Sequence, residues 1–337
     1  MATIYDIAKE ARVGIGTVSR VFNNHPSVSD DTKKRVLRVA NRLKYQPHPY
    51  ARGLARKRTN SILAFIPFFS TFFFVEVLRG VQAGLHDLEF DLILYGVNHP
   101  DHVENSLKRN ALRGRGDGLL FCSMRIPDDS EKEYLPENVP VVLIDTVHPS
   151  FDSFYIDNKQ GAVAATRHLI SLGHKNIGIL LANLESYPAR QRLEGFRTAM
   201  KESGLPVREE WVRRSSSPYL DGFNRETGYS LMKEFLGKKN QMPTAIFVSS
   251  DIQAAGALSA IEEAGLNCPG DVALVGFDDI ELAGHMGLST MRQPMFQMGS
   301  MAAARLVERM KDPLLEPKQT LFVPELIVRK SSGVTIG

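Results

Sequence analysis

Basic side chains are concentrated at the start of this chain. The first 60 residues contain 13 lysines and arginines against four acidic residues, a net charge of +9, whereas the other 277 residues contain 28 basic and 34 acidic residues and carry −6. A dense positive charge attracts the phosphates of nucleic acids. We therefore expect a polyanion-binding module attached to a mildly acidic body. A solvated charged surface without a binding role is the weaker alternative.

A second group of polar side chains follows short apolar runs. Asp145 follows "VPVVLI", Ser250 and Asp251 follow "TAIFVS", and Asp278 and Asp279 follow "DVALVGF". If these runs are parallel strands, their carboxyl ends meet at one edge of a sheet, which is where α/β folds bind small ligands. These side chains are therefore candidates for a ligand site.

Sequence motifs for catalysis and metal binding are absent. The chain has no G-x-S-x-G, H-E-x-x-H or C-x-x-C, and the glycines of "RGRGDG" do not fit a dinucleotide fingerprint after a strand. His99 and His102 in "HPDH" share a loop with a proline, which disfavours a metal site. Cys122 and Cys268 are too few and too far apart for a disulfide framework or a metal cluster. We expect no enzyme activity, no cofactor and no metal.

The composition is that of a soluble globular protein. With 43% hydrophobic and 23% charged residues over 337 positions, the chain is long enough for two or three folded units. It contains no apolar stretch of the roughly 18 residues that a membrane span needs, and "MATIYDIAKE" lacks a signal-peptide profile. We expect a cytoplasmic protein with no membrane partner. An exported solute-binding protein is disfavoured for the same reason.

Three short helices are predicted in the basic region. Thr3 and Asp6 form a capping-box pattern at the start of the first helix, and Gly14 separates this helix from a second one in "IGTVSRVFN". Ser29 is placed to cap the third helix. The predicted apolar faces consist of Ile4, Ile7, Ala8, Ala11, Val18, Val21, Phe22, Val36, Val39, Ala40 and Leu43. Two helices joined by a tight glycine turn are typical of a helix-turn-helix.

The segment "TIYDIAKEARVGIGTVSRVFNNHPSVSDDTKKRVLRVANRLKYQPHPYARGLARKRTNSI" closely resembles the head of the LacI/GalR family of bacterial transcription regulators. "YIDNKQGAVAATRHLISLGHKNIGIL", "VALVGFDDIELA" and "SMAAARLVERMKDP" extend the resemblance along the whole chain. The resemblance implies a repressor that binds a near-palindromic operator as a homodimer, possibly a tetramer. A small-molecule effector, most simply a sugar, would control it. A nucleobase effector or a phosphorylated partner protein remains an alternative.

The resemblance also assigns DNA contacts by position. Thr17 and Ser19 correspond to phosphate contacts, and Arg20 corresponds to a reader of a base edge in the major groove. Ile15 and Gly16 occupy positions that vary with the operator, although both could simply be turn residues. The complete predicted DNA-contact set is Thr3, Tyr5, Ile15, Gly16, Thr17, Ser19, Arg20, Asn23, Ala51 and Leu54.

Residues 48–59 correspond to the family's hinge, which links the head to the body. In the family this segment forms a helix on operator DNA and inserts a leucine into the minor groove, and Leu54 stands at that position with Ala51 beside it. His48 replaces the usual asparagine cap, and Gly53 lowers helix stability by about 1 kcal/mol relative to alanine. We expect the hinge to fold only on DNA. The four basic residues at 52 and 56–58 argue against a plain flexible linker.

After residue 60 the sequence alternates apolar runs with amphipathic segments. "SILAFIP", "FDLILYG", "DGLLFCS", "VPVVLID", "NIGILLA", "TAIFVSS" and "DVALVGFD" are predicted to be buried parallel strands. We predict an N-terminal all-α helix-turn-helix head at 1–47 and an α/β body at 60–337 that binds effector and dimerises. The body is two doubly wound parallel-sheet subdomains of periplasmic-binding-protein-like type. The N-subdomain comprises about 60–159 and 292–319, and the C-subdomain about 160–291 and 320–331.

The resemblance places an effector between the two subdomains. The positions that line this cleft are Phe73, Asp145, Arg192, Phe223, Ser250, Asp278 and Gln293. Carboxylates and a guanidinium bind vicinal hydroxyls, and aromatic rings cover the apolar face of a sugar or stack on a base. We expect Arg192 and Asp278 to contact the ligand rather than form a purely structural ion pair. Asp157 and Asn158 are expected to be structural, and Asp251 is expected to cap a helix. Ser250 and Phe68 depart from the family's asparagine and aspartate, which predicts a less polar pocket.

Overall fold

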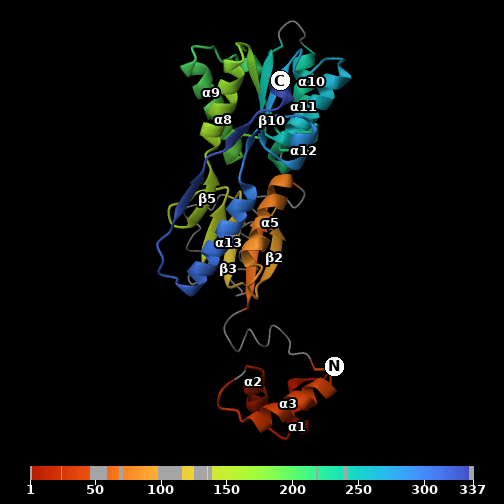
Figure 1. The fold of residues 1–337 in the computed structure, drawn as a ribbon, viewed down its shortest axis with the longest axis vertical. Coiled ribbons are helices and arrows are strands. Elements are labelled where there is room, and N and C mark those ends of the chain that lie inside the picture. The colour runs from red at the N-terminus through yellow and green to blue at the C-terminus, as the bar shows by residue number, and fades with distance from the viewer. Residues whose placement is uncertain are drawn as a thin grey trace.

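The computed structural model describes residues 2–23, 25–45, 59–67, 71–97, 116–124, 135, 139–217, 219–237 and 242–333. The chain begins with the three predicted helices, α1 (Ile4–Glu10), α2 (Ile15–Phe22) and α3 (Asp30–Arg42) (Figure 1). Ile7, Val18, Val21 and Val36 are fully or almost fully buried between them. The helix-turn-helix prediction is confirmed at the level of secondary structure and core.

The starts of the three helices differ in how their backbone is capped. Thr3 and Asp6 form the predicted capping box on α1. Gly14 is the N-cap of α2 and offers no side-chain bond. Ser29 is the N-cap of α3, but its hydroxyl donates to Thr32 Oγ1 at 3.0 Å and makes no cap bond to the backbone. The acidic first turn of α3 therefore supplies the stabilisation that its helix dipole receives at this end.

The body contains two mainly parallel sheets, as predicted, and each has six strands. The first has the order β11-β5-β4-β3-β1-β2 and the second β12-β10-β9-β8-β6-β7. The first sheet is built from β1 (Ser61–Ile66), β2 (Asp91–Gly96), β3 (Gly118–Cys122), β4 (Val141–Ile144), β5 (Asp152–Ile156) and β11 (Gln319–Phe322). The second is built from β6 (Ile177–Leu181), β7 (Val212–Arg214), β8 (Ala245–Val248), β9 (Ala273–Asp278), β10 (Ser289–Arg292) and β12 (Glu325–Ile327). In the described residues every strand pairing is parallel except that of β10 with β12.

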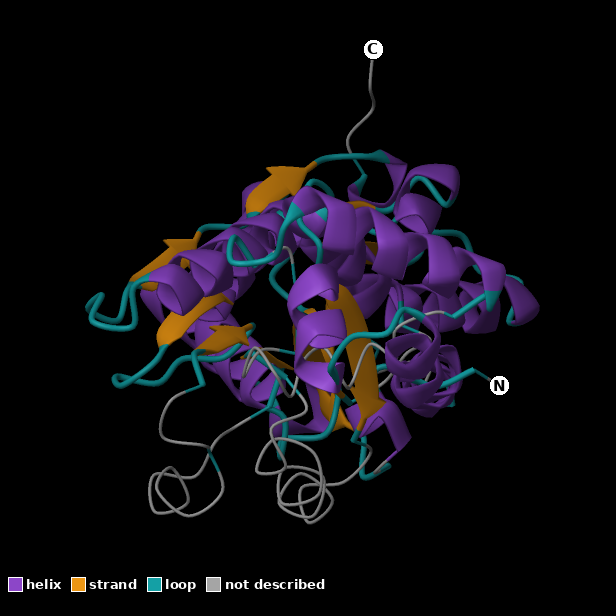
Figure 2. Ribbon diagram, turned by 90° about the horizontal axis from the view of Figure 1, so that it is seen from below, coloured by secondary structure: helices purple, strands orange, loops and turns teal. Residues whose placement is uncertain are grey.

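Helices lie on both sides of the strands (Figure 2). The first sheet carries α5 (Phe72–Leu85) and α13 (Met295–Lys311), and the second carries α8 (Asn158–Ser171), α9 (Tyr187–Glu202), α10 (Arg225–Leu236), α11 (Asp251–Glu263) and α12 (Glu281–His285). Short 3₁₀ helices occur at Glu209–Trp211, Tyr219–Gly222 and Lys330–Ser332. α10 and α11 approach closely through glycines: a Cβ on Gly228 would lie 1.9 Å from the Gln253 backbone oxygen. No described helix is long and apolar enough to span a membrane.

The chain passes between the two sheets three times. It leaves the first sheet after β5, returns after β10 and leaves again after β11. The third crossing differs from the predicted boundary at 319/320, because residues 320–322 pair with β5 in the first sheet. Val323 and Pro324 separate β11 from β12, so the chain forms a strand on each side of them. Proline provides the break between the two strands, since it cannot donate a ladder hydrogen bond.

The sheets differ from the prediction in the exposure of β2 and in five strands that the apolar runs did not indicate, β5, β7, β10, β11 and β12. β2 lies at the edge of the first sheet and is partly exposed, so the prediction of a buried strand there is wrong. β5 was not predicted as a strand, since Asp152 and Ser153 interrupt its apolar character. Both residues are completely buried, and each has a polar partner. Asp152 pairs with Arg305 at 2.6 Å, and the Ser153 hydroxyl donates to the backbone oxygen of Phe151.

Candidate functional site

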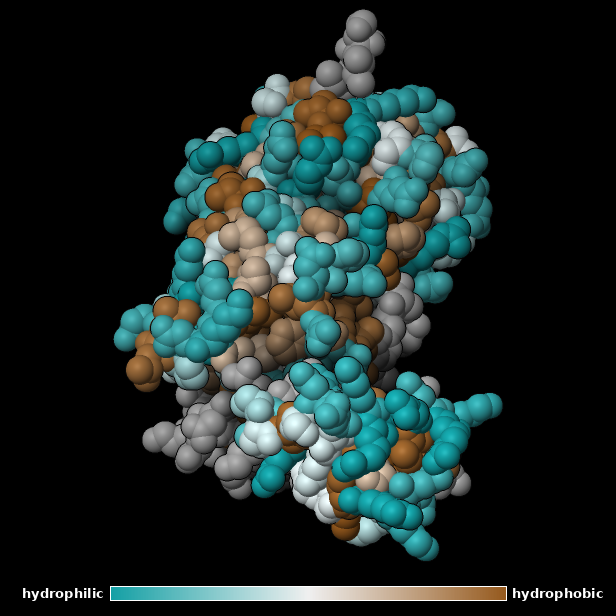
Figure 3. Space-filling view, turned by 60° about the horizontal axis from the view of Figure 1, so that its bottom comes forward, coloured by the Kyte–Doolittle hydropathy of each residue, from teal (hydrophilic) through white to brown (hydrophobic). Residues whose placement is uncertain are grey.

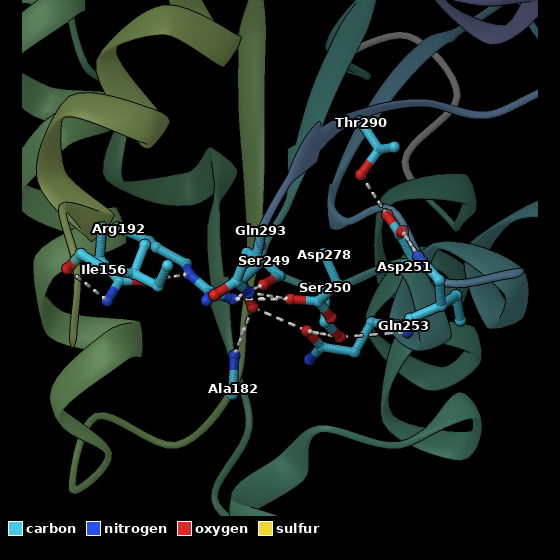
Figure 4. A network of polar contacts seen from close by, with 12 residues as sticks. Ile156, Ala182, Arg192, Ser249, Ser250, Asp251, Gln253, Asp278, Thr290 and Gln293 are labelled. Carbon is cyan, nitrogen blue, oxygen red and sulfur yellow. Dashed lines mark hydrogen bonds and ion pairs between the residues drawn. The ribbon is translucent and has the colours of Figure 1, made fainter. Parts of the chain in front are cut away.

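Arg192 on α9 is at the centre of a buried polar network (Figure 4). The residue is only 4% exposed. Its Nε donates to Asn158 Oδ1 at 2.9 Å, and its Nη1 donates to the backbone oxygen of Ser249. Asp278 Oδ1 lies 3.8 Å from the same Nη1. The guanidinium is thus held by α8, by the end of β8 and by the end of β9.

Aromatic rings also contact the guanidinium. Its central carbon lies 3.8 Å from the centroid of the Phe277 ring and 5.8 Å from that of Phe223. Burial lowers the pKa of Arg192, whereas the nearby charges of Asp278 and Asp145 raise it. The cation remains charged at neutral pH, because the ordinary pKa of arginine lies far above neutrality. Its orientation is therefore fixed by hydrogen bonds and by ring contact together.

Asp278 is the last residue of β9 and has a φ of 126°. Its Oδ1 accepts a hydrogen bond from Gln293 Nε2 at 2.6 Å, and its backbone oxygen accepts one from Gln293 N at 3.2 Å. The other amide atom of Gln293, Oε1, is buried and has no hydrogen-bond partner. Burial raises the pKa of Asp278 to about 6, although Arg192 and Gln293 counteract this effect.

Asp145 occupies the corresponding position in the first sheet, directly after β4. It is buried with a φ of 58°, and Ser123, which follows β3, donates its hydroxyl to Asp145 Oδ2 at 2.5 Å. Burial raises the pKa of Asp145 to about 6, while Ser123 and Arg192 counteract this effect. Arg192 thus lowers the pKa of carboxylates that follow strands of both sheets.

Ser250 and Asp251 follow β8, and it is Ser250 rather than Asp251 that caps the next helix. Ser250, expected to contact the effector, is the N-cap of α11: its hydroxyl accepts from Gln253 N and donates to Gln253 Oε1. Asp251, expected to be a cap, is instead fully buried and accepts from Thr290 Oγ1 at 2.6 Å and from Ile280 N at 3.0 Å. Burial raises the pKa of Asp251, and Asp278 raises it further. The prediction of Asp251 as a helix cap is therefore wrong.

The two predicted aromatic residues lie in different surroundings. Phe223 is half-buried and close enough to Arg192 for a cation–π contact. Phe73 is half-buried in the first turn of α5, where its ring meets Phe74 edge to face at 5.2 Å. Of the predicted ligand set, the structure thus brings Arg192, Asp278, Gln293 and Phe223 together, with Asp145 linked by charge. Phe73 belongs to the packing of the N-subdomain.

Four residues of the network were not predicted to be part of the site: Ser123, Asn158, Ser249 and Phe277. Asn158 was expected to be structural, and it does position Arg192 through its side-chain oxygen. Ser249 could not be identified from its residue type, because it accepts the hydrogen bond of Arg192 through a backbone oxygen that any residue could offer. Phe277 precedes Asp278 in a strand and follows the pattern of a core residue. The sequence pattern therefore gave no sign that its ring contacts the Arg192 guanidinium.

Asp279 fixes the turn that carries Asp278. It also has a positive φ, of 57°, and its carboxylate receives Arg292 Nε and Arg329 Nη2, each at 2.7 Å. Arg292 ends β10 just before the chain crosses to the first sheet, and Arg329 follows β12 after the last crossing. A residue next to the candidate ligand site is therefore bonded to the strand that precedes the second crossing and to the segment that follows β12.

On the head, the predicted DNA-contact residues of α2 are mostly accessible. Ile15 is 43% exposed, Arg20 is exposed, and a Cβ on Gly16 would have no neighbour within 4 Å. Thr17 and Ser19 are half-buried, and Asn23 Nδ2 donates to Ser19 Oγ at 3.5 Å.

Two other head residues of the predicted set differ from each other. Tyr5 is 66% exposed, whereas the hydroxyl of Thr3 is already used in the capping box of α1. Ala51 and Leu54 lie outside the described residues. The accessible side chains of the set therefore centre on α2 and on Tyr5.

The first described residues after the hinge are anchored to the body. Asp117, just before β3, accepts hydrogen bonds from Thr59 N at 2.8 Å, Thr59 Oγ1 at 2.9 Å and Asn60 N at 2.8 Å. One carboxylate thus fixes two consecutive backbone N–H groups. This bonding sets where the hinge segment joins the first sheet.

Comparison with known proteins assigns both parts of the chain. Residues 3–48 match the model for bacterial regulatory proteins of the lacI family, and residues 166–332 match a periplasmic binding protein-like domain. Catabolite control protein A of Priestia megaterium is 34% identical over 91% of this chain and 92% of its own length. The chain belongs to the LacI family of bacterial transcription regulators. The HTH-type transcriptional repressor PurR of Haemophilus influenzae is also 36% identical to this LacI-family regulator over 98% of both chains.

Solved structures confirm the fold of the LacI-family regulator. A Lac repressor dimer bound to operator and the anti-inducer ONPF is 25% identical, with a TM-score of 0.82, over 98% of this chain and 99% of that one. A complex of the transcriptional regulator CelR with cellobiose is 28% identical, with a TM-score of 0.70, over 98% of this chain and 100% of that one. The predicted architecture and the assignment as a DNA-binding transcriptional regulator are confirmed, and the relatives are regulators rather than enzymes.

Proposed function

We propose that this protein is a cytoplasmic repressor that binds a near-palindromic operator as a homodimer. A small sugar-like molecule that binds between its subdomains either lowers or raises its affinity for the operator. The observation that carries the DNA-binding part is the exposed row on α2, where Arg20 stands accessible in a region of charge +9. The Lac repressor relative, a dimer bound to operator, supports this mode. Dimers place two such helices in successive half-sites of a symmetric DNA.

In this proposal the residues of α2 make different kinds of contact with the DNA. Arg20 bonds a guanine through O6 and N7, and the hydroxyls of Thr17 and Ser19 bond phosphates. Ile15 and Gly16 have no side-chain donors, so they contribute at most contact with a thymine methyl and close approach. Leu54 in the hinge acts as the minor-groove wedge. Much of the remaining specificity then comes from how easily the DNA deforms at the centre of the site.

The buried polar site around Arg192 is proposed to hold the effector. It combines carboxylates, an amide and aromatic surface, which suits a small polar ring. The relative solved with cellobiose supports a sugar over other classes. Because Gln293 and Arg292 belong to a crossing segment, a ligand that bonds Asp278 would bias the relative position of the subdomains.

Dimerisation is proposed through the body. Large apolar side chains are exposed on α5, β2 and α12, namely Phe72, Val75, Leu94 and Leu282. Figure 3 shows apolar surface gathered on part of the body among otherwise polar side chains. Exposed apolar surface of this kind marks protein–protein contact. A tetramer would require a further interface.

Selection of duplexes from a random DNA library by the purified full-length chain tests the proposal. The expected product is an inverted repeat whose affinity falls steeply with salt, because several phosphates are neutralised. A melting-shift screen of sugars and nucleobases, followed by operator titration with each hit, then tests effector control. Recovery of no common sequence would overturn the operator assignment. Hits that leave operator affinity unchanged would overturn the allosteric part.

A further inference from the structure

The first sheet has an open edge at β11. This strand is the outermost of the sheet, and within the described residues it pairs only with β5. The backbone oxygens of Lys318 and Phe322 accept hydrogen bonds from the β5 side, each at 2.9 Å. Successive residues of a strand direct their N–H and C=O groups to opposite sides. Gln319, Leu321 and Val323 therefore direct theirs away from the sheet.

The side chains along this edge are apolar or uncharged. Leu321 is 48% exposed and Val323 is 69% exposed. No charged residue occurs from 319 to 324. Leu314, in the segment that leads into the strand, is 90% exposed. Since proteins usually protect an exposed edge with a charge, a bulge or a covering element, an apolar edge of this kind is a place where another strand can be added.

This edge is separate from the surface proposed for dimerisation. β2 is the opposite edge strand of the same sheet, and the exposed apolar side chains assigned to the dimer lie on β2, α5 and α12. Figure 1 shows β2 and β5, the neighbour of β11, on opposite sides of the first sheet. A chain that dimerises through β2 and α5 therefore keeps its β11 edge free.

The residues at the ends of β11 restrict how a second strand can pair with it. Pro317 and Pro324 flank the outward-facing residues, and a proline cannot donate a ladder hydrogen bond. In an antiparallel pair of identical strands, one register uses all three outward-facing residues of both chains. In that register Leu321 lies opposite itself, and Gln319 lies opposite Val323. Each such pair exchanges both of its backbone hydrogen bonds.

The charges at the ends of the strand favour the same arrangement. Lys318 precedes the uncharged stretch and Glu325 follows it. Antiparallel copies bring the lysine of one chain to the end where the glutamate of the other lies, whereas parallel copies would align like charges. The edge is thus complementary to a second copy of itself in register and in charge.

We propose that β11 is a second self-association surface, at which two chains join their first sheets through antiparallel pairing centred on Leu321. Together with the proposed dimer contact, this surface links dimers into a tetramer or a longer assembly. Because the contact involves few residues, the assembly is expected to form at high protein concentration and to dissociate on dilution.

Sedimentation velocity of the full-length chain over a range of micromolar concentrations tests the surface. The wild type is expected to form a species larger than the dimer, in a proportion that rises with concentration. Leu321→Lys should lose this species and keep the dimer, because two lysines would face each other at the centre of the pairing. Leu172→Lys is the matched control, since Leu172 is 38% exposed at the end of α8 in the other subdomain, and it should behave as the wild type. Absence of the larger species in the wild type, or its retention in Leu321→Lys, would overturn the proposal.

Crosslinking of cysteine variants tests the register. Position 321 lies about 5 Å from its counterpart in the proposed pairing, whereas position 323 lies opposite 319 and is about 14 Å from its own counterpart. A bismaleimide too short for the longer distance should join two chains of Leu321→Cys but not of Val323→Cys, although Val323 is the more exposed residue. The wild type gives the background from Cys122 and Cys268.

Faster crosslinking of Val323→Cys than of Leu321→Cys would show that exposure rather than pairing brings the chains together, and it would contradict the proposal. Neither measurement uses DNA or effector, and crosslinking at position 321 does not require the contact through β2 and α5. Failure of the β11 pairing is therefore distinct from failure of the proposed function.

Discussion

Replacing Arg192 by methionine should destabilise the folded protein, because buried carboxylates lose the cation that compensates them. Methionine keeps much of the length and the contact with Phe277, but it removes the one buried cation that the described residues place beside Asp278 and that acts on Asp145 and Asp251 as well. It also leaves Asn158 Oδ1 and the Ser249 backbone oxygen without their donor. Breaking a buried ion pair on one side costs about 3–5 kcal/mol. We expect a loss of that size in the free energy of unfolding at pH 8.

The loss should depend on pH with a definite sign. Asp145 and Asp278 have folded-state pKa values raised from 3.8 to about 6, so each binds its proton more tightly in the folded protein. Stability from such groups is fully present below their unfolded pKa and is lost as pH rises through the folded one. For one carboxylate considered alone, this shift corresponds to about 3 kcal/mol between full protonation and full ionisation. Without Arg192 both pKa values rise further, so the difference between variant and wild type should grow from pH 5 to pH 8.

Urea-induced unfolding at pH 5 and pH 8 provides the assay. Trp211 is the only tryptophan of the chain and is buried in the same subdomain as Arg192, so its fluorescence reports on the relevant unit. Arg167→Met is the matched control, because Arg167 is 58% exposed and pairs with Glu202 at the surface of α8. The control should lose less than about 1 kcal/mol at both pH values. Equal losses for Arg192→Met at the two pH values would refute the electrostatic reasoning.

Three further predictions concern the hinge, its anchor and the helix packing. Leu54→Ala should weaken binding to a selected operator far more than binding to random DNA, and equal losses in a titration would contradict the wedge role. Asp117→Asn should leave the melting temperature nearly unchanged but weaken operator affinity, since asparagine offers one acceptor oxygen for the two backbone donors. Gly228→Ala should cost more than about 2 kcal/mol in urea unfolding, because its Cβ would lie 1.9 Å from a backbone oxygen of α11. Gly284→Ala, with open space around it, should cost nothing and serves as its control.

Elements with a strong apolar pattern could be predicted from the sequence. β1, β3, β4, β6, β8 and β9 are continuous apolar runs that are completely buried, and the structure confirms them. β2 has the same composition but lies at an edge of its sheet, and composition alone does not distinguish edge from centre. β7 has only three residues, two of them arginines, so its pairing with β6 could not be anticipated from its pattern.

The ligand site was predictable only in part. Asp145, Arg192, Asp278 and Gln293 were identified through the resemblance, and the structure links them through the Arg192 network, although effector binding by them remains a proposal. The cap of α11 was assigned to Asp251 instead of Ser250, because both residue types cap helices and only the geometry shows which oxygen faces the backbone N–H of Gln253. The bonds of Asp279 to Arg292 and Arg329 span distant segments, so no local pattern predicts them.

The base preference of Arg20→Ala tests the central claim most directly. Binding of the wild type and the variant is measured against every single-base change of the selected operator, with Arg38→Ala on α3 as an exposed basic control. The variant is expected to lose about 1–3 kcal/mol and to stop discriminating at one base pair, at symmetric positions in both half-sites. The control should weaken all sequences alike. An unchanged preference profile in Arg20→Ala would contradict the account of how this regulator reads DNA.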